Sequence, residues 1–212
     1  MPTIDQITIA DEPSVWTALG FDVRDSECQL GTVTVELSGE RRDAGVVGWS
    51  LRDVSDTDLD GLPTASSLRA PRTPALAHPN HVVAIDHVVA ISPAFDRSVA
   101  TLQAAGLDLR RVREEPTPAG APRQAFFRLG REILELVEEP ADVVEQNGGS
   151  GRPARFWGLA LLVEDLDATV AAMAPHAAPP RAAVQPGRRI STLGRSAGLS
   201  MPVALMSREE GR

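Results

Sequence analysis

AIDHVVAISPAFDRSVATLQAAG, residues 84–106, joins a predicted β-strand directly to a predicted α-helix. Its first nine residues are mostly apolar and rich in Val and Ile, which is typical of a buried strand. Phe95, Val99 and Leu102 then recur at helical spacing, and Gly106 marks the expected end of the helix. Three extended segments follow, at 107–115, 123–130 and 131–139. This part of the chain therefore predicts a β-α-β-β-β unit.

Two other segments begin in the same way. TIDQITIAD (3–11) and RFWGLALLVED (155–165) each read as an apolar strand that leads into a helical pattern, and the first of these helices is short. Self-similarity of this kind indicates repeated structural units. We expect an α+β protein with three repeated β-α-β-β-β units, the first one shortened, forming curled mixed sheets with helices on their outer face.

Composition divides the chain between these repeats. We predict a β-α-β-β-β half module at 1–55 and complete units at 81–140 and 155–208, which pair with each other because their lengths match. The segment 56–80, rich in Pro, Ser, Thr and Ala, is predicted as a linker, and 141–154, with its Asn-Gly-Gly-Ser-Gly run, as a loop. His78 falls in the linker, where we expect it to be exposed to solvent.

A Leu-Gly…Glu-Leu pattern occurs twice, in QLGTVTVEL (29–37) and RLGREILEL (128–136). Glu135 has apolar neighbours on both faces of its strand, so it is expected to be sheltered and to need a partner, for which His87 is the candidate. Glu36 shares its strand face with Thr and Ser, and that face either lines a polar cleft or faces water. A Glu in the same place of two strands makes both carboxylates candidate functional groups.

Composition excludes several classes of function. The 212-residue chain has a formal charge of −8 and no Lys or Tyr. A nucleic-acid partner is disfavoured by this charge, and Schiff-base chemistry, a Walker-type lysine and a tyrosine general acid are unavailable. No apolar run approaches the roughly 20 residues of a membrane helix, and no secretory signal is predicted. Cys28 is the only cysteine, which fits a cytoplasmic protein without an internal disulfide.

Tandem β-α-β-β-β units resemble the vicinal oxygen chelate superfamily, which includes glyoxalase I, extradiol dioxygenases, fosfomycin resistance enzymes, methylmalonyl-CoA epimerase and the bleomycin-binding proteins. The resemblance is clearest over 83–138. In that superfamily two units pair around a cleft, and metal ligands come from the first and last strands. The resemblance implies His87 and Glu135 as ligands in the second repeat and Gln6 and Glu36 in the first.

The third repeat has only Gly158 and, approximately, Ala204 at the matching positions, and neither residue has a side chain that binds metal. The ligand set Gln6, Glu36, His87 and Glu135 resembles that of one glyoxalase I type and suits Zn²⁺, Ni²⁺, Co²⁺ or Mn²⁺. Dioxygenase and fosfomycin-type sites need two His and one carboxylate, so both are disfavoured. A His87–Glu135 hydrogen-bonded pair without any metal is the structural alternative.

Two functions follow from this resemblance. The first is a glyoxalase-like, metal-dependent lyase or isomerase that acts on a small α-oxygenated carbonyl compound, with Glu135 and Glu36 as catalytic bases. The alternative is a non-catalytic, bleomycin-resistance-type protein that binds a small molecule through a degenerate metal site.

Arg128 and Arg131 either bind an anionic group of the substrate or are solvated charges at strand ends. Trp49 and Trp157 either line an apolar pocket or belong to the core. We expect a small-molecule ligand, no nucleic-acid or membrane partner, and a homodimer, since an odd half module leaves a sheet edge unpaired.

Overall fold

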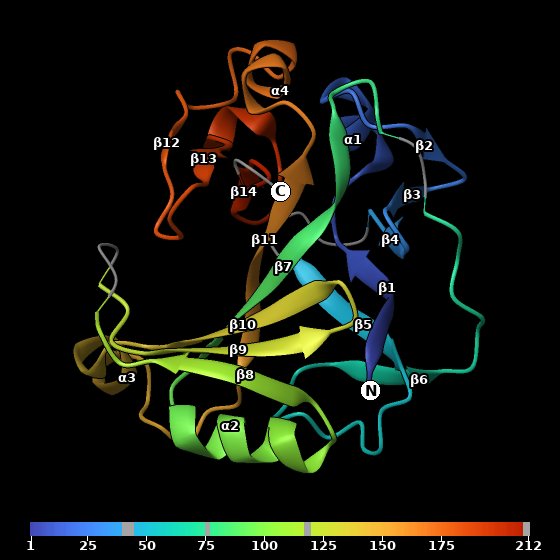
Figure 1. Ribbon diagram of the computed structural model, residues 1–212. Coiled ribbons are helices and arrows are strands. Elements are labelled where there is room, and N and C mark those ends of the chain that lie inside the picture. The colour runs from blue at the N-terminus through green and yellow to red at the C-terminus, as the bar shows by residue number, and fades with distance from the viewer. Residues whose placement is uncertain (40–44, 75–76, 117–119, 210–212) are drawn as a thin grey trace. The chain divides into compact units, whose positions relative to one another are not determined.

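The computed structural model describes residues 1–39, 45–74, 77–116 and 120–209, and Figure 1 shows its elements. The first repeat and the segment after it contain β1 (Thr3–Ile9), α1 (Pro13–Ala18), β2 (Val23–Arg24), β3 (Glu27–Leu30), β4 (Val33–Leu37), β5 (Val46–Arg52) and β6 (Thr64–Ser67). The second contains β7 (Val82–Ser92), α2 (Phe95–Ala104), β8 (Asp108–Arg113), β9 (Gln124–Leu129), β10 (Glu132–Glu138) and α3 (Ala141–Gln146). The third contains β11 (Arg155–Val163), α4 (Leu166–Ala172), β12 (Arg181–Ala182), β13 (Arg189–Thr192), the 3-10 helix Arg195–Ala197 and β14 (Val203–Met206).

The strands form two mixed sheets, with the orders β2-β3-β4-β1-β5-β6 and β12-β13-β14-β11-β7-β10-β9-β8. Each repeat uses the same pairing, because its last strand runs parallel to its first strand and antiparallel to the strand before it. This arrangement confirms the predicted α+β class with repeated β-α-β-β-β units.

The three repeats also share one register. Glu36 of β4 lies opposite Thr8, two residues after Gln6, and Glu135 of β10 lies opposite Val89, two residues after His87. In the third repeat Ala204 of β14 lies opposite Ala160, two residues after Gly158. The positions that the sequence pattern aligned are therefore structurally equivalent.

The first repeat contains a short β-hairpin before its last strand. Segment 21–28 turns at Asp25 and Ser26, both with positive φ, and this turn separates β2 from β3. The repeat is therefore complete at Leu37. β5, which follows this repeat, is an additional strand beside β1.

The chain divides into two compact units, and the long strands β1, β5, β7 and β11 contribute residues to both. One unit contains 1–5, 48–69 and 87–157, and the other contains 6–47, 70–86 and 158–212.

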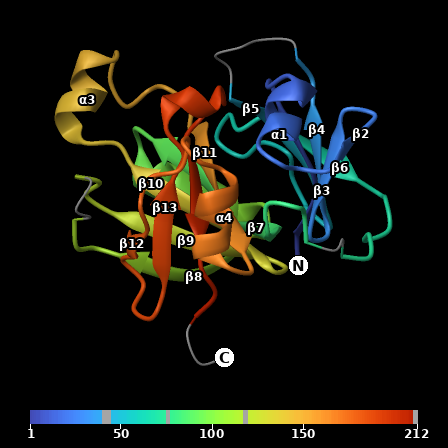
Figure 2. The ribbon, with the colours of Figure 1, turned by 90° about the horizontal axis from the view of Figure 1, so that it is seen from above.

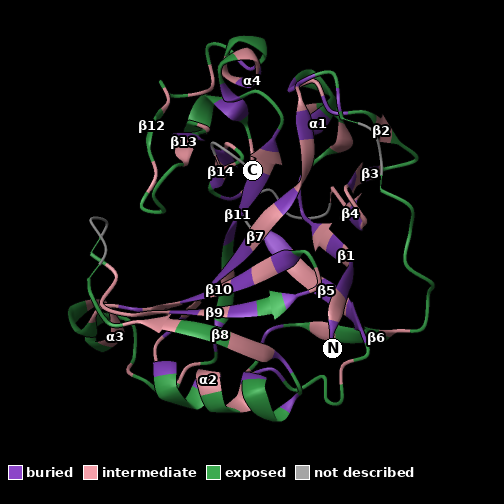
Figure 3. Ribbon diagram, in the orientation of Figure 1, coloured by how far each residue is buried: buried purple, intermediate pink, exposed green. Residues whose placement is uncertain are grey.

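In the first of these units, α2 lies along β8, β9 and β10 (Figure 1). The helix buries Phe95, Ser98 and Leu102 and exposes its outer side (Figure 3). Leu134 and Leu136 of β10 are fully buried, whereas Glu135 between them is only partly buried. Alternation along β10 therefore separates its buried Leu face from the face that carries Glu135.

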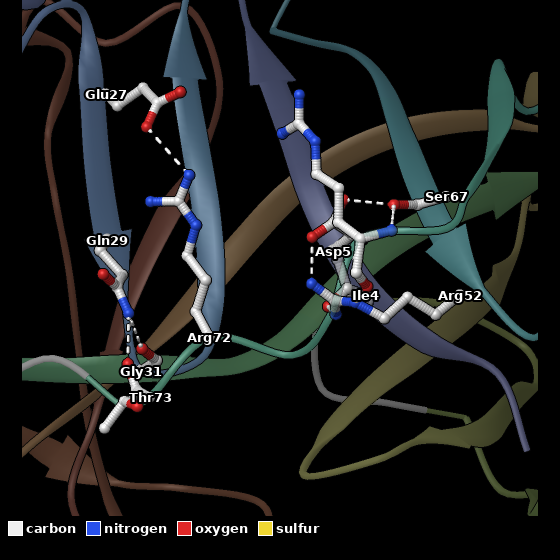
Figure 4. Close-up of polar contacts among 10 residues, drawn as sticks. Ile4, Asp5, Glu27, Gln29, Gly31, Arg52, Ser67, Arg72 and Thr73 are labelled. Carbon is white, nitrogen blue, oxygen red and sulfur yellow. Dashed lines mark hydrogen bonds and ion pairs between the residues drawn. The ribbon is translucent and has the colours of Figure 1, made fainter.

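In the same unit, a buried ion pair joins β1 and β5. The Arg52 guanidinium pairs with the buried carboxylate of Asp5 and donates hydrogen bonds to the backbone oxygens of Ile4 and Arg69, each at 2.8 Å (Figure 4). Asp5 also accepts a 2.6 Å bond from the Ser67 hydroxyl. Because a buried charge is costly without partners, this network explains how β5 can end in a buried Arg.

In the second unit, α4 lies beside β13 (Figure 2). Asp165 caps α4 by accepting a hydrogen bond from the Ala168 N–H. The other helix of this unit, α1, begins at Pro13 and buries Trp16, whose ring packs against Phe21 with centroids 4.7 Å apart. Among the described residues, no helix is long and apolar enough to cross a membrane.

The segments predicted as linker and loop contain regular structure. The 56–80 segment includes β6, which pairs in parallel with β5, and the 141–154 segment begins with α3. His78 was expected to be exposed, but it is buried. Its Nδ1 accepts a hydrogen bond from the Asp22 N–H at 3.0 Å, and its Nε2 lies 3.0 Å from the Gln29 oxygen. Both ring nitrogens have backbone partners, which is the physical reason that the prediction was wrong.

Candidate functional site

His87 and Glu135 lie together on one face of neighbouring strands. His87 is on β7 opposite Ile133, and Glu135 follows two residues later on β10, so their side chains point to the same side of the sheet. His87 Nε2 lies 3.2 Å from Glu135 Oε2, and the two side chains are 20% and 14% exposed. The structure thus brings these two predicted residues into contact at a site that retains access to solvent.

Gln124 of β9 is a third member of this cluster. Its Nε2 donates a hydrogen bond to Glu135 Oε1. Its own Oε1 is buried and has no hydrogen-bond partner among the described residues. Sequence reasoning missed Gln124, because only the antiparallel register of β9 and β10, with Gln124 opposite Val137, brings it to Glu135.

Apolar side chains surround the His87–Glu135–Gln124 cluster on the same face of the sheet. Cross-strand partners share a face, so the register identifies them as Val89 and Ile91 of β7, Ile133 and Val137 of β10, and Phe126 of β9. Polar groups set among such neighbours interact more strongly than they would in water.

Gln6 and Glu36 form the corresponding pair in the first repeat. Gln6 Nε2 donates to Glu36 Oε2 at 2.7 Å, and the Thr8 hydroxyl donates to the same oxygen at 3.0 Å. Thr34 lies opposite Gln6, and its buried hydroxyl has no hydrogen-bond partner among the described residues. The side chain of Glu36 is therefore held by protein donors rather than by water alone.

The third repeat has no functional pair at this register, and packing explains why. A Cβ atom on Gly158 would lie 2.4 Å from the Pro202 oxygen, a distance that no side chain tolerates. The backbone of β11 approaches the start of β14 so closely that only glycine fits at this position.

The other candidates from the sequence lie outside these clusters. Arg128 and Arg131 are exposed, and Arg128 donates to the Gly130 oxygen at 3.0 Å. Trp49 is buried, packs edge-on against Phe156 and donates to the Thr64 hydroxyl, which makes it a core residue. Trp157 is 45% exposed.

The single cysteine is not a nucleophile. Cys28 is buried with its sulfur 3.7 Å from His78 Nε2, and burial raises the pKa of the Cys28 thiol to about 12. A reactive cysteine requires a lowered pKa, so this thiol stays protonated at neutral pH. Burial also lowers the pKa of His78, which keeps its imidazole neutral.

The donor chemistry of the His87 cluster fits a divalent metal ion. In the part of the chain that the structure describes, no group of three or more His, Cys, Asp and Glu side chains is arranged so that it could hold a metal ion by itself. However, His87 and Glu135 provide an imidazole nitrogen and a carboxylate, and Gln124 adds an amide oxygen without a partner. A mixed nitrogen and oxygen set of this kind suits Zn²⁺, Ni²⁺, Co²⁺ or Mn²⁺.

Comparison with known proteins identifies the fold. No protein-family model and no curated protein matches the sequence. Methylmalonyl-CoA epimerase from Mycobacterium tuberculosis is similar with a TM-score of 0.51 and 18% identity, over 63% of this chain and 92% of that chain. A fusion of a xylose isomerase-like TIM barrel with 4-hydroxyphenylpyruvate dioxygenase has a TM-score of 0.57 and 12% identity, over 99% of this chain and 50% of that chain. With the repeated strand order and the shared register, these similarities show that the chain has the vicinal oxygen chelate fold.

Proposed function

We propose that the protein is a metal-dependent isomerase or lyase of the vicinal oxygen chelate type, acting on a small α-oxygenated carbonyl compound. The observation that supports this proposal is the His87–Glu135 contact of 3.2 Å, set among apolar side chains and accompanied by a buried amide oxygen of Gln124 without a partner. A purely structural His–Glu pair leaves that amide oxygen unexplained.

In this proposal His87 and Glu135 hold the metal ion, and Gln6 and Glu36 remain ligands predicted from the sequence. When bound, such an ion supplies Lewis acidity that favours negative charge on a substrate oxygen. Glu135 is the proposed base and accepts a proton from the carbon next to the substrate carbonyl. Gln124 keeps the Glu135 carboxylate in place, and the apolar side chains around this carboxylate limit the access of water. Glu36 is retained as the second proposed catalytic carboxylate.

Metal content of the purified protein tests the proposal. We expect about one ion per chain by elemental analysis, and a ratio near zero in His87→Ala, because an ion with too few protein ligands is lost. His176→Ala is the control, since this histidine lies outside the cluster and its Nδ1 contacts the Ser196 hydroxyl at 3.1 Å. A wild-type ratio near zero that titration with Zn²⁺, Ni²⁺, Co²⁺ or Mn²⁺ does not raise would sink the proposal.

A non-catalytic binding protein is the second candidate, and the third repeat favours it. Gly158 cannot be replaced by a ligand residue without displacing backbone, so the position equivalent to His87 cannot supply a metal ligand in this repeat. A binding protein would keep its affinity for a small carbonyl compound after treatment with a chelator. The enzyme would lose its turnover under the same treatment.

We further propose a homodimer and a cytoplasmic location. β6 and β2 are the edge strands of one sheet, and exposed edges favour pairing between chains. The buried thiol of Cys28 is compatible with a reducing compartment. Light scattering at micromolar concentration should give twice the mass of one chain, and a single-chain mass would contradict the dimer.

A further inference from the structure

Residues 70–74 and 77–80 form a segment, here called the strap, that contacts the β2–β3 hairpin of the first repeat. His78 lies at the buried end of the strap. Its Nδ1 accepts a hydrogen bond from the Asp22 N–H at 3.0 Å, and its Nε2 lies 3.0 Å from the Gln29 backbone oxygen. The imidazole therefore joins the strap to the hairpin on both sides of the hairpin turn.

These two contacts fix the tautomer of His78. A backbone N–H only donates and a backbone oxygen only accepts, so Nδ1 must be unprotonated and Nε2 must carry the proton. Protonation of Nδ1 would set an N–H donor against the Asp22 N–H, where no hydrogen bond can form. The contact with Asp22 therefore exists only while the imidazole is neutral.

The groups around His78 compensate a positive charge poorly. The Asp22 carboxylate faces the ring, but it already accepts two hydrogen bonds from Arg24. The Cys28 thiol, 3.7 Å from Nε2, is buried and protonated, and the Phe21 ring packs edge-on with centroids 5.5 Å apart. Burial lowers the pKa of His78 by more than Asp22 raises it. Protonation is therefore unfavourable while the ring stays in place.

The rest of the strap is held by exposed contacts. The Gln29 amide donates to the Thr73 oxygen at 2.7 Å, and Arg72 pairs with Glu27 at 3.4 Å (Figure 4). Exposed contacts of this kind contribute little, because water competes for the same groups. His78 is therefore the buried attachment of the strap to the hairpin.

The strap borders the polar face that carries Gln6 and Glu36. Gln29 lies opposite Thr34, which in turn lies opposite Gln6. Glu27 lies opposite Glu36. Cross-strand partners share a face, so the two side chains that bind the exposed part of the strap belong to the same face as the candidate pair. Movement of the strap therefore changes the edge of that face.

We propose that His78 is a pH-sensitive switch, whose protonation breaks the Asp22 contact and releases the strap from the hairpin. Release opens the outer edge of the face that carries Gln6 and Glu36. This inference stands apart from the proposed function, since it requires neither a metal ion nor a substrate. The open fraction should rise as the pH falls below about 6.5, the ordinary pKa of an exposed imidazole.

Cys28 reports the opening, because it is buried with its sulfur against the His78 ring. It is the only cysteine, so dithiodipyridine, a disulfide reagent that reacts at acidic and neutral pH, labels this site alone. Dividing the labelling rate of the folded protein by that of the urea-unfolded protein at the same pH removes the pH dependence of the reagent. We expect this ratio to be about tenfold higher at pH 5 than at pH 7.5. An equal ratio at the two pH values would overturn the proposal.

Two histidine variants test the assignment to His78. His78→Gln keeps a donor and an acceptor but does not titrate, so the rise at pH 5 should disappear. His81→Asn is the matched control on the same segment, because Asn tolerates the positive φ of this position and keeps the N–H that donates to the His78 oxygen. This variant should show the wild-type rise. The same rise in His78→Gln as in the wild type would contradict the switch.

Nitrogen NMR on the wild-type protein avoids dependence on the folding of a variant. At pH 7.5 the ring of His78 should carry its proton on Nε2 and none on Nδ1. The opposite tautomer would remove the basis of the proposal, since Nδ1 could not then accept from Asp22.

Low concentrations of urea separate release of the strap from unfolding of the whole chain. Global unfolding exposes a large surface and so responds steeply to urea, whereas a local opening responds little. The labelling rate at pH 5 should therefore stay nearly constant below the unfolding transition. A steep rise with urea in this range would assign the exposure of Cys28 to global unfolding and would overturn the proposal.

Discussion

The Gln6–Glu36 pair and the His87–Glu135 pair occupy the same register in two repeats, but their surroundings differ. Glu36 receives two hydrogen bonds from neutral donors, at 2.7 Å from Gln6 and at 3.0 Å from Thr8, both on the same carboxylate oxygen. Glu135 receives one from Gln124, and its other oxygen lies 3.2 Å from an imidazole nitrogen. At equivalent backbone positions, Glu36 is therefore hydrogen-bonded by an amide and a hydroxyl group, whereas Glu135 contacts the titratable ring of His87.

This difference shows that the repeat determines the place of a carboxylate, whereas the neighbouring strand determines its chemistry. In the first repeat the neighbour across the ladder from Glu36 is Thr8, which can donate; in the second it is Val89, which cannot. Glu135 therefore takes its partners from His87 and from β9. We expect its carboxylate to be the more reactive of the two, because its partners leave one oxygen facing the imidazole.

Substitution of Glu135 should have the largest effect. Glu135→Gln removes the proposed base while keeping the shape of the side chain. The probe is hydroxyacetone, a small α-oxygenated carbonyl compound. We expect the exchange of its α protons with deuterium in D2O to slow by about 10²- to 10⁴-fold in this variant. Proton NMR measures this exchange directly. Glu36→Gln in the same assay sharpens the comparison, since a smaller loss is expected there. Equal losses would show that the two carboxylates are functionally equivalent and would break the distinction.

A side chain at Gly158 tests the third member of the register. Gly158→Ala places a Cβ against the Pro202 oxygen, so we expect a loss of about 1–3 kcal/mol in the free energy of unfolding, as for overpacked sites. Urea denaturation measures the change. Gly151→Ala is the control, because a Cβ at Gly151 meets no atom within 4 Å and its φ is not positive. An unchanged stability in Gly158→Ala would mean that packing does not exclude a ligand residue from this repeat.

Gln6→Ala should destabilise the protein by about 1 kcal/mol, because it removes one of the donors to a partly buried carboxylate. A double-mutant cycle with Glu36→Ala measures the coupling between the two residues in urea denaturation. A coupling energy near zero would indicate that water replaces Gln6 without loss. The carboxylate would then be an ordinary solvated group, the alternative that the sequence left open.

The smallest expected effect is a pH dependence of stability that comes from His78. This residue contacts the backbone oxygen of Gln29 on β3, the strand next to the one that carries Glu36. Burial lowers the pKa of His78 in the folded state, so the unfolded state binds the proton more readily. The stability that neutral His78 contributes is present above its unfolded pKa, about 6.5, and is lost as the pH falls through and below that value. Two titratable groups lie near His78. The Asp22 carboxylate raises the pKa of His78, but burial lowers it by more, and the Cys28 thiol stays protonated and neutral between pH 5 and pH 7.5.

Urea denaturation at pH 7.5 and pH 5 tests this dependence. The decrease in stability between the two pH values should be smaller in His78→Gln than in the wild-type protein. His176→Ala should show the wild-type decrease. The same decrease in His78→Gln as in wild type would assign the pH dependence to other groups.

The repeated units were predictable because hydrophobic periodicity and the Gly-bounded strands are local signals. The segment 84–106 specifies a strand and a helix by itself, and the Leu-Gly…Glu-Leu pattern placed Glu36 and Glu135 at equivalent positions that the ladders confirm. Local signals failed where long-range contacts decide the outcome. His78 reads as a linker residue, yet its two backbone partners lie 56 and 49 positions earlier in the chain.

Gln124 shows the same limit at the candidate site. Nothing in RQAFFRLG distinguishes this residue from any other polar residue at the start of a strand, since its importance comes from the pairing of β9 with β10. The Gly at 158 was identified from sequence as lacking a ligand, but only the approach of the Pro202 oxygen explains why no ligand residue fits.

The sequence by itself determined the repeated β-α-β-β-β pattern and the aligned positions of Gln6, Glu36, His87 and Glu135, because side-chain periodicity and glycine conformation act over a few residues. Tertiary structure alone decided which groups touch these carboxylates, since hydrogen-bond partners and burial depend on which strands become neighbours. The contact of His87 with Glu135, the two donors on Glu36 and the buried oxygen of Gln124, which has no partner among the described residues, all arise at that second level.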